Sequence, residues 1–218
     1  MRSYHQFCGL ARALDHVGHR WTLLIVRELL LGPKRFTDLR EGLPGIANNL
    51  LADRLRQLQD DGLVIQQTLP PPAANTVYEL TDAGHALREA IEALIRWGGR
   101  WMTSGPDDDT FRPGWLLLAL DALGVGARAE DGTTIDLVVG GEPLRIEVHD
   151  GRLTPRRRPA KRADLTVKGE ASVILGIAAG AVPPDDALAT LTLQPVDAHT
   201  ATTFTRIFSP GSRSAPAH

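Results

Sequence analysis

The residues with the clearest chemical potential share one side of a predicted helix that follows the Pro44-Gly45 turn; they are Asn49, Ala52, Asp53 and Arg56. At about 100° per residue, this side faces away from an apolar stripe formed by Ala47, Leu51, Leu55 and Leu58. In the major groove of DNA, an asparagine amide can pair with adenine and an arginine guanidinium with guanine. An ordinary amphipathic surface helix carries the same residue types, because Asn and Arg are common on solvated faces. The neighbouring elements therefore have to decide between the two interpretations.

A shorter helix is predicted before the turn, and a β-hairpin is predicted after the longer helix. The shorter helix has an apolar side formed by Phe36, Leu39 and Leu43. The hairpin has a strand beginning at 63–65, a turn-rich tip with the sequence PPPAANT, and a returning strand with Val77, Tyr78 and Leu80. This order is typical of a winged helix-turn-helix. We therefore expect DNA contacts from Lys34, Arg35, Asn48, Asn49, Ala52, Asp53, Arg54, Arg56, Asn75 and Thr76.

Three further helices are predicted around this motif. A short N-terminal helix that ends at Gly18 is indicated by the spacing of Phe7, Leu10, Leu14 and Val17. Residues 19–31 (HRWTLLIVRELLL) are apolar almost all round, so they should form the most deeply buried helix of this half, stopped by Gly32-Pro33. A last helix should begin at Thr81-Asp82 and run to residue 101, with an apolar side formed by Leu87, Ile91, Leu94, Ile95 and Trp97.

Composition and charge restrict the class of protein. The 218 residues are 43% hydrophobic and 23% charged, as in soluble globular proteins, and the length allows two small domains. The net charge of -2 gives no overall attraction to nucleic acid, so a DNA contact has to come from a local patch. A single cysteine, Cys8, excludes an intramolecular disulfide. Because no apolar run is long enough to span a membrane and no signal peptide is present, a cytoplasmic protein is expected.

The sequence contains no recognisable pattern for catalysis or metal binding. Its seven histidines do not combine with acids or a nucleophile at a known spacing, and His16 with His19 alone does not make a metal site. No Gly-x-Ser-x-Gly, P-loop or dinucleotide fingerprint occurs. We expect neither enzyme activity nor a cofactor or metal.

The N-terminal half resembles the HxlR-type bacterial transcription regulators over residues 5–101. The resemblance is carried by Gly18-x-x-Trp21, Arg35-Phe36, Leu43-Pro44-Gly45-Ile46, Leu55, Leu58, Gly62-Leu63-Val64 and Tyr78-x-Leu80-Thr81-x-x-Gly84. Ala47 stands where the family usually has Ser, and Gly9 where Pro is common. The resemblance implies a DNA-binding homodimer that pairs through its terminal helices, here residues 5–17 and 82–101. It also places Cys8 where members often carry a cysteine, which makes Cys8 a candidate redox sensor; the alternative is a small buried apolar residue.

Residues 103–113 (TSGPDDDTFRP) form a predicted linker with a solvated acidic run, and a different pattern begins after it. An apolar helix is predicted over 115–123, strands over 126–130, 133–139, 144–149 and 163–167, helices over 170–180 and 185–189, an edge strand at Leu191 and Leu193, and a closing helix over 196–208. The turns are supplied by Asp131-Gly132, Gly140-Gly141 and Asp150-Gly151. A meander of strands packed on apolar helices predicts an α+β domain. The predicted limits are 1–102 for the winged helix-turn-helix domain, 114–209 for the α+β domain and 210–218 for a disordered tail.

This second half resembles the sterol carrier protein type 2 domain, through TIDLVVGGEPLRIEVHDGRL, ADLTVKGEASVILGIAAG and a terminal helix ending in Phe208. The resemblance implies an apolar ligand held between sheet and helices, with candidate walls Trp115, Leu118, Val173, Ile174, Ile177, Phe204 and Phe208. The alternative is that these residues simply form the core. A basic cluster, Arg156-Arg157-Arg158 with Lys161-Arg162, also has two interpretations, a phosphate or anion contact and a solvated loop.

Together these patterns predict a mainly α winged helix-turn-helix followed by an α+β sterol-carrier-like domain. The expected protein is a homodimeric transcription regulator that binds double-stranded DNA and senses a hydrophobic small molecule. The alternative is a carrier of lipids or other apolar ligands, or an assembly protein, that uses the winged helix as a dimerisation scaffold. The polar wing tip and the outward Asn49 and Arg56 argue against this alternative.

Overall fold

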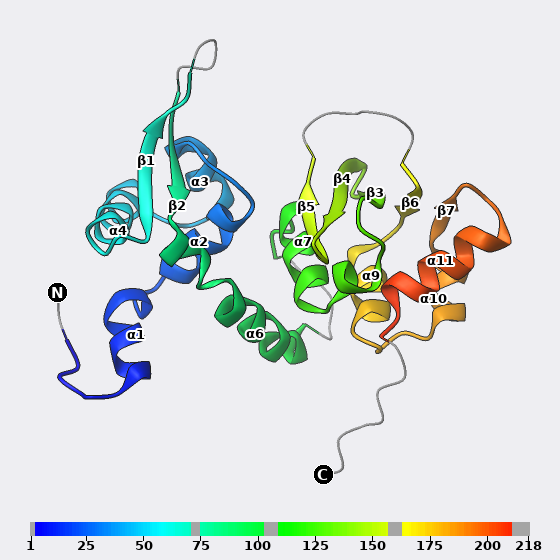
Figure 1. The fold of residues 1–218 in the computed structure, drawn as a ribbon, viewed down its shortest axis with the longest axis horizontal. Coiled ribbons are helices and arrows are strands. Elements are labelled where there is room, and N and C mark those ends of the chain that lie inside the picture. The colour runs from blue at the N-terminus through cyan, green and yellow to red at the C-terminus, as the bar shows by residue number, and fades with distance from the viewer. Residues whose placement is uncertain (1–2, 71–74, 103–108, 157–162, 211–218) are drawn as a thin grey trace. The chain divides into compact units, whose positions relative to one another are not determined.

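The computed structural model describes residues 3–70, 75–102, 109–156 and 163–210, which divide into two compact units (Figure 1). The first unit comprises residues 1–91 and the second residues 92–218. The division falls inside a helix rather than in the predicted linker. Four predicted features lie wholly or partly outside the described residues: the wing tip at 71–74, the linker at 103–108, the basic cluster at 157–162 and the tail at 211–218.

The first unit has the element order of the predicted winged helix-turn-helix. Its elements are α1 (Gly9–Val17), α2 (Thr22–Leu30), α3 (Phe36–Gly42), α4 (Asn48–Asp60), β1 (Val64–Thr68), β2 (Thr76–Leu80), α5 (Asp82–His85) and α6 (Arg88–Gly98), of which α6 continues into the second unit. The two strands pair antiparallel, from Val64 opposite Leu80 to Thr68 opposite Thr76. Figure 1 shows them projecting as a hairpin beyond α3 and α4.

The core of the first unit is formed by the apolar sides that the helical spacing predicts. Helix α2 is the most buried helix of the unit, with Ile25, Val26, Leu29 and Leu30 in the interior. Helices α3 and α4 add Leu39, Leu43, Leu51, Leu55 and Leu58. Each such side chain contributes about 1.5–3 kcal/mol when it is fully buried. This packing fixes which side of α4 faces outward.

Three details of the first unit differ from the prediction. Ala47 is exposed, because it is the extended residue before α4 and does not follow the helical spacing of the buried stripe. Helix α2 begins at Thr22 rather than His19, because Trp21 has a φ of 80°, which a right-handed helix cannot accommodate. The predicted helix over 82–101 is interrupted between α5 and α6 and ends in a 3-10 turn, Gly99–Trp101.

The second unit is an α+β domain built on a five-stranded sheet. Its elements are α7 (Pro113–Ala122), α8 (Val125–Arg128), β3 (Thr134–Val139), β4 (Glu142–His149), β5 (Arg152–Pro155), β6 (Leu165–Lys168), α9 (Ala171–Ala178), α10 (Pro184–Thr190), β7 (Thr192–Gln194) and α11 (Ala198–Phe208). The strand order is β5-β4-β3-β6-β7. Neighbouring strands are antiparallel except β3 and β6, which are parallel, so the predicted meander is limited to β3, β4 and β5.

One face of this sheet carries the apolar residues that alternate along its strands. Ile135 lies opposite Ile146 on one side and Leu165 on the other, and all three are fully buried. Helix α7 contacts β4, β5 and α9, and α9 contacts α11. Four leucines of α7 are buried, at 116, 117, 118 and 120, so this helix is enclosed almost all round. In the described part of the chain, no helix is long and apolar enough to cross a membrane.

Two predictions for the second unit need correction. The predicted strand over 126–130 is wrong: these residues belong mainly to the short helix α8, which follows Gly124 in the left-handed conformation. Helix α8 packs closely against the turn before β5: a Cβ on Gly126 would lie 2.6 Å from the Gly151 carbonyl oxygen, so this position requires glycine. Strand β5 was not predicted, although the Asp150-Gly151 turn is the hairpin connection that leads into it.

Candidate nucleic-acid interface

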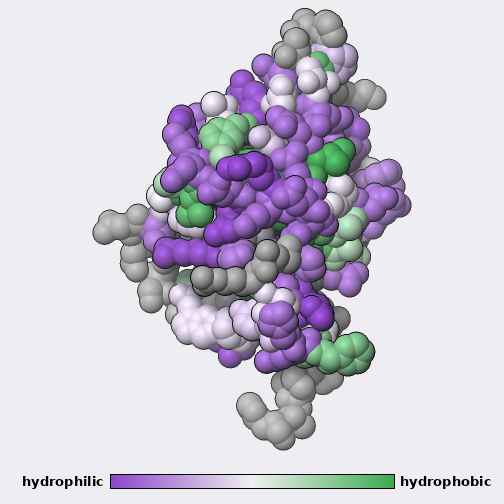
Figure 2. All heavy atoms as spheres, turned by 90° about the vertical axis from the view of Figure 1, so that its left-hand side faces the viewer, coloured by the Kyte–Doolittle hydropathy of each residue, from purple (hydrophilic) through white to green (hydrophobic). Residues whose placement is uncertain are grey.

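The outward side of α4 carries the polar residues that the sequence assigns to base contacts. Asn48, Asn49, Asp53 and Arg56 are exposed, whereas Ala52 is half-buried. Hydrophilic side chains predominate on the face of the molecule seen in Figure 2, the side on which α4 lies in Figure 1. The structure therefore places an amide and a guanidinium group on solvent-facing helix surface, opposite Leu51, Leu55 and Leu58.

Charged side chains on α4 pair within the helix. The guanidinium of Arg56 bonds to Asp53, and that of Arg54 bonds to Gln57, each three residues away. Both members of the Arg56–Asp53 pair are mostly solvent-exposed, so the pair is weak, on the order of 0–1 kcal/mol. Arg54 is half-buried beside the leucine stripe, so it projects less freely than Arg56.

Lys34 is tied to the wing through its backbone. Its N–H donates to the Tyr78 carbonyl at 3.0 Å, and its carbonyl accepts from the Tyr78 N–H at 2.8 Å. Lys34, two residues before α3, thus extends the two-stranded sheet by one bridge. Sequence reasoning missed this pairing, because the two residues are far apart in the chain and Lys34 lies in no strand-like run.

Arg35 precedes α3 and is engaged with Asp38. Its backbone N–H donates to Asp38 Oδ2 at 3.0 Å, and its Nη2 donates to Oδ1 at 2.7 Å. This contact holds the pKa of Asp38 below its usual range and raises the pKa of Arg35. Asp38 therefore accepts the backbone N–H at the start of α3 and also holds the Arg35 guanidinium, so Lys34 is the better candidate for a dedicated phosphate contact.

The wing offers polar groups along its length. The predicted contacts Asn75 and Thr76 are exposed at the start of β2. Gln66 and Gln67 on β1 are exposed as well, and Gln67 donates to Glu79 across the hairpin. These two glutamines were not predicted as contacts; the signal that could have indicated them is the polar run Gln66-Gln67-Thr68 inside a strand next to the tip.

The turn before α4, at Pro44-Gly45, lies next to the side chain of Trp21. Gly45 has a φ of +88°, a left-handed conformation that favours glycine, and a Cβ placed there would lie 3.8 Å from the Trp21 ring. Trp21 is itself held in an unusual conformation, with the Arg20 guanidinium 5.6 Å from its ring centre. The resemblance pattern Gly18-x-x-Trp21 and Leu43-Pro44-Gly45 thus corresponds to one packed corner of the fold.

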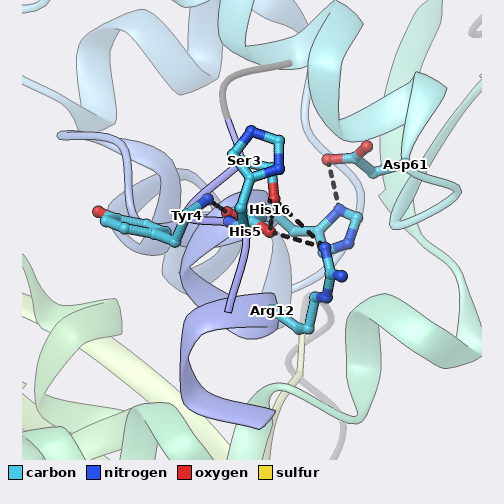
Figure 3. A network of polar contacts seen from close by, with 7 residues as sticks. Ser3, Tyr4, His5, Arg12, His16 and Asp61 are labelled. Atoms are coloured by element: carbon cyan, nitrogen blue, oxygen red, sulfur yellow. Dashed lines mark hydrogen bonds and ion pairs between the residues drawn. The ribbon is translucent and has the colours of Figure 1, made fainter. Parts of the chain in front are cut away.

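The C-terminal end of α4 contacts α1 (Figure 3). His16 Nδ1, in the last turn of α1, lies 3.2 Å from Oδ2 of Asp61, which follows α4 directly. One residue earlier, the buried carboxylate of Asp15 accepts the Tyr4 N–H and the Ser3 hydroxyl, both at 2.9 Å. The Tyr4 contact is the main cause of a lowered pKa for Asp15. The segment before α1 and the end of α4 are therefore both bound to the same helix.

Large apolar side chains are exposed on α1 and on the second half of α6. They are Phe7, Leu10 and Leu14 near and on α1, and Leu94, Trp97 and Trp101 on α6 and the turn after it. Cys8, the residue before α1, is also exposed in the single chain. Exposed apolar groups of this size are typical of interaction surfaces.

The candidate ligand walls of the second unit come together in its interior. Leu118, Ile174, Ile177, Phe204 and Phe208 are buried, and Trp115 and Val173 are half-buried. They lie on α7, α9 and α11, which are in contact through α9. The rings of Phe204 and Phe208 stack at 4.8 Å between centres. Among the described residues, no group of three His, Cys, Asp or Glu side chains could hold a metal ion.

The first unit is a winged helix-turn-helix, a class of DNA-binding protein. It combines the short helix α3, the helix α4 with its polar side outward and its leucines buried, and a hairpin bridged to the segment before α3. Residues 16–106 match the HxlR-like helix-turn-helix family. The chain is similar to the HTH-type transcriptional regulator YodB of Bacillus subtilis (strain 168), with 34% identity over 93 residues that make up 43% of this chain and 83% of YodB. The chain belongs to the HxlR-like helix-turn-helix family, and its first unit is that of a DNA-binding transcription regulator.

Two further similarities concern the same region. The uncharacterized HTH-type transcriptional regulator YtfH of Escherichia coli (strain K12) is 34% identical over 90 residues, which are 41% of this chain and 71% of YtfH. The solved structure of the reduced form of YodB matches with a TM-score of 0.40 and 33% identity, over 46% of this chain and 99% of that one. These relatives are transcription regulators, and each of these matches covers less than half of this chain.

Proposed function

We propose that this regulator binds double-stranded DNA as a homodimer, with α4 in the major groove, and that its second unit senses a hydrophobic small molecule. The observation that carries the DNA-binding part is the exposed side of α4. Asn49 and Arg56 are the side chains that can read base edges there, and Lys34, Arg35, Asn75 and Thr76 flank them with groups suited to the backbone. Asn48, Ala52, Asp53 and Arg54 complete the proposed contact surface.

The DNA-binding proposal is tested by capturing genomic fragments on the full-length protein, sequencing them and measuring affinity by fluorescence anisotropy. Specific fragments should bind in the nanomolar range at physiological salt, and the logarithm of the affinity should fall linearly with the logarithm of the salt concentration. Equal affinity for all sequences would contradict base readout by α4.

The homodimer is supported by the exposed apolar groups of α1 and α6. A charged residue at either surface should separate the protomers, because a carboxylate cannot be buried without a partner. We expect Leu10→Glu and Leu94→Glu to sediment as monomers. The control Thr202→Glu, on an exposed position of α11, should keep the dimer. Dimers in both leucine variants would place the interface elsewhere.

Ligand sensing is supported by the apolar density of α7, α9 and α11 and by the sterol-carrier resemblance. A ligand would have to separate Phe204 and Phe208 from their present neighbours, gaining about 25 cal/mol per Å² of apolar surface removed from water. The test measures thermal shifts of the full-length protein with fatty acids, sterols and aromatic polyketides. Ala178→Trp, which fills a buried position on α9, should abolish binding, while Ala179→Trp at the exposed neighbour should not. If no compound binds, the second unit is an assembly module, and a lipid carrier is excluded with it.

A second candidate function is redox sensing by Cys8. The thiol is exposed at the N-terminus of α1, where the backbone N–H groups of Ala11 and Leu10 lower its pKa and so favour the reactive thiolate. Peroxide or benzoquinone should then change DNA affinity in the wild type but not in Cys8→Ser. If DNA binding by Cys8→Ser responds to these oxidants as the wild type does, this role is excluded.

A further inference from the structure

Helix α6 carries two different surfaces on opposite sides of its second half. Glu92 and Arg96 are one turn apart on one side, whereas Leu94 and Trp97 point away from them at about 100° per residue. The second side is exposed and continues into Trp101, whose ring meets that of Trp97 edge-on at 4.5 Å. All of these residues belong to the second unit.

The side with Glu92 and Arg96 is bound to the rest of the second unit. Arg152, at the start of β5, places Nη1 2.9 Å from Glu92 Oε1 and 3.5 Å from Asp121 Oδ2. Arg96 Nη1 donates to the carbonyl of Ala122 at 2.9 Å, at the C-terminal end of α7, where helix carbonyls carry partial negative charge. Two neighbouring residues of α7 are thus connected to one side of α6.

The Arg152 contact is more than a surface ion pair. The side chain of Asp121 is 3% exposed and that of Glu92 is 12% exposed, so both carboxylates are largely removed from water. Asp121 also accepts the Leu153 N–H at 3.0 Å, which fixes its orientation. Without Arg152, two poorly hydrated carboxylates would lose a shared cation, a change that costs more than breaking an exposed pair.

From this arrangement we infer that Arg152 is a positioning residue through which the second unit controls the apolar side of α6. The inference rests on the proposed ligand-sensing dimer. Helix α7 contacts α9, and both carry candidate ligand walls. A ligand that shifts α7 against α9 would displace Asp121 and Ala122, and their contacts with Arg152 and Arg96 would re-aim Leu94, Trp97 and Trp101. The ligand then favours one position of this apolar side over the other, and a dimer contact made by that side responds to the ligand.

The test uses the full-length protein with Arg152→Met, which removes the charge, and Arg152→Lys, which keeps it. Arg206→Met is the matched control, because the Arg206 side chain is 50% exposed, close to the 45% of Arg152, and pairs with Glu130, which follows α8 in the chain. Hydrogen exchange is followed over residues 92–101, and the dimer dissociation constant is measured by sedimentation. We expect Arg152→Met to raise exchange and weaken the dimer by about fivefold or more, and Arg152→Lys to restore most of both.

Two results would overturn the inference. One is an exchange rate over residues 92–101 in Arg152→Met that stays within about twofold of the wild-type rate, and the other is an equal rise in Arg206→Met. If Arg152→Met unfolds the sheet, seen as faster exchange in β3 and β4, Glu92→Gln decides, because it leaves Arg152 beside Asp121; the same rise over 92–101 is expected. A monomeric wild type would refute the proposed dimer, and the exchange measurement would still decide whether Arg152 positions α6.

Discussion

Replacing Arg56 with alanine should weaken binding to the cognate DNA site strongly and binding to unrelated DNA little. In the free protein the Arg56 guanidinium is bonded to Asp53, but this exposed pair contributes only about 0–1 kcal/mol, so it does not prevent Arg56 from turning to a base. A bidentate contact with guanine contributes about 1–3 kcal/mol of discrimination. At 1.4 kcal/mol per tenfold, the expected loss is about 5- to 150-fold in Kd.

Asp53→Asn provides the matched test of the same reasoning. It frees Arg56 and removes a carboxylate that would face phosphates, so we expect tighter binding to all DNA, by up to about fivefold. Both variants are titrated by anisotropy against a captured genomic site and a scrambled duplex at three salt concentrations, with Arg206→Ala as the control. Wild-type affinity in both Arg56→Ala and Asn49→Ala would refute the assignment of this side of α4 to the groove.

Three further predictions address the parts that support α4. Lys34→Ala should weaken all DNA about equally and reduce the salt slope by about 0.9, measured by anisotropy, because it removes a phosphate contact and no base contact; a sequence-dependent loss would contradict this role. Gly45→Ala should lower the free energy of unfolding by about 1–2 kcal/mol in urea titrations, because alanine is strained at a φ of +88°; an unchanged midpoint would be inconsistent with it. Asp15 stabilises the fold above its unfolded pKa of about 3.9 and loses this contribution as pH falls through its lower folded pKa, because the Tyr4 N–H favours the carboxylate. Between about pH 5 and pH 3 the wild type should therefore lose more stability than Asp15→Asn in the same titrations, and parallel curves would show that the contact has no linkage to folding.

The helices of the first unit were predictable because their apolar spacing is determined locally. Leu51, Leu55 and Leu58 specify the buried side of α4, and that alone specifies the outward side with Asn49 and Arg56. What could not be predicted depends on partners distant in sequence or on competing polar contacts. The Lys34–Tyr78 bridge is one case, and the engagement of Arg35 by Asp38 is a second, because an arginine at a helix start can contact phosphate or pair with an acidic residue one turn later.

In the second unit, the alternation of apolar and polar residues and the turn residues predicted β3, β4 and β6. They did not predict which strands pair with one another. The parallel pairing of β3 with β6 follows a crossover connection, and no turn signal encodes it. The strand predicted over 126–130 is wrong for a related reason. Small residues such as Gly126 and Ala127 fit a strand or a helix, and the partner of Gly126, the Gly151 backbone, is distant in sequence. Five of the seven candidate walls are buried and two, Trp115 and Val173, are half-buried; whether they enclose a ligand depends on volumes that a pattern of residue types does not contain.

The division of the chain inside α6 has a consequence for building chimaeras. A chain cut at the predicted linker would keep Glu92 and Arg96 but discard Arg152 and Ala122, which bind them. A graft of the second unit onto another winged helix should therefore carry the second half of α6 with it. The junction that keeps both sets of contacts lies between Ile91 and Glu92, because Ile91 is buried and Arg88 donates to the Leu30 carbonyl in the first unit.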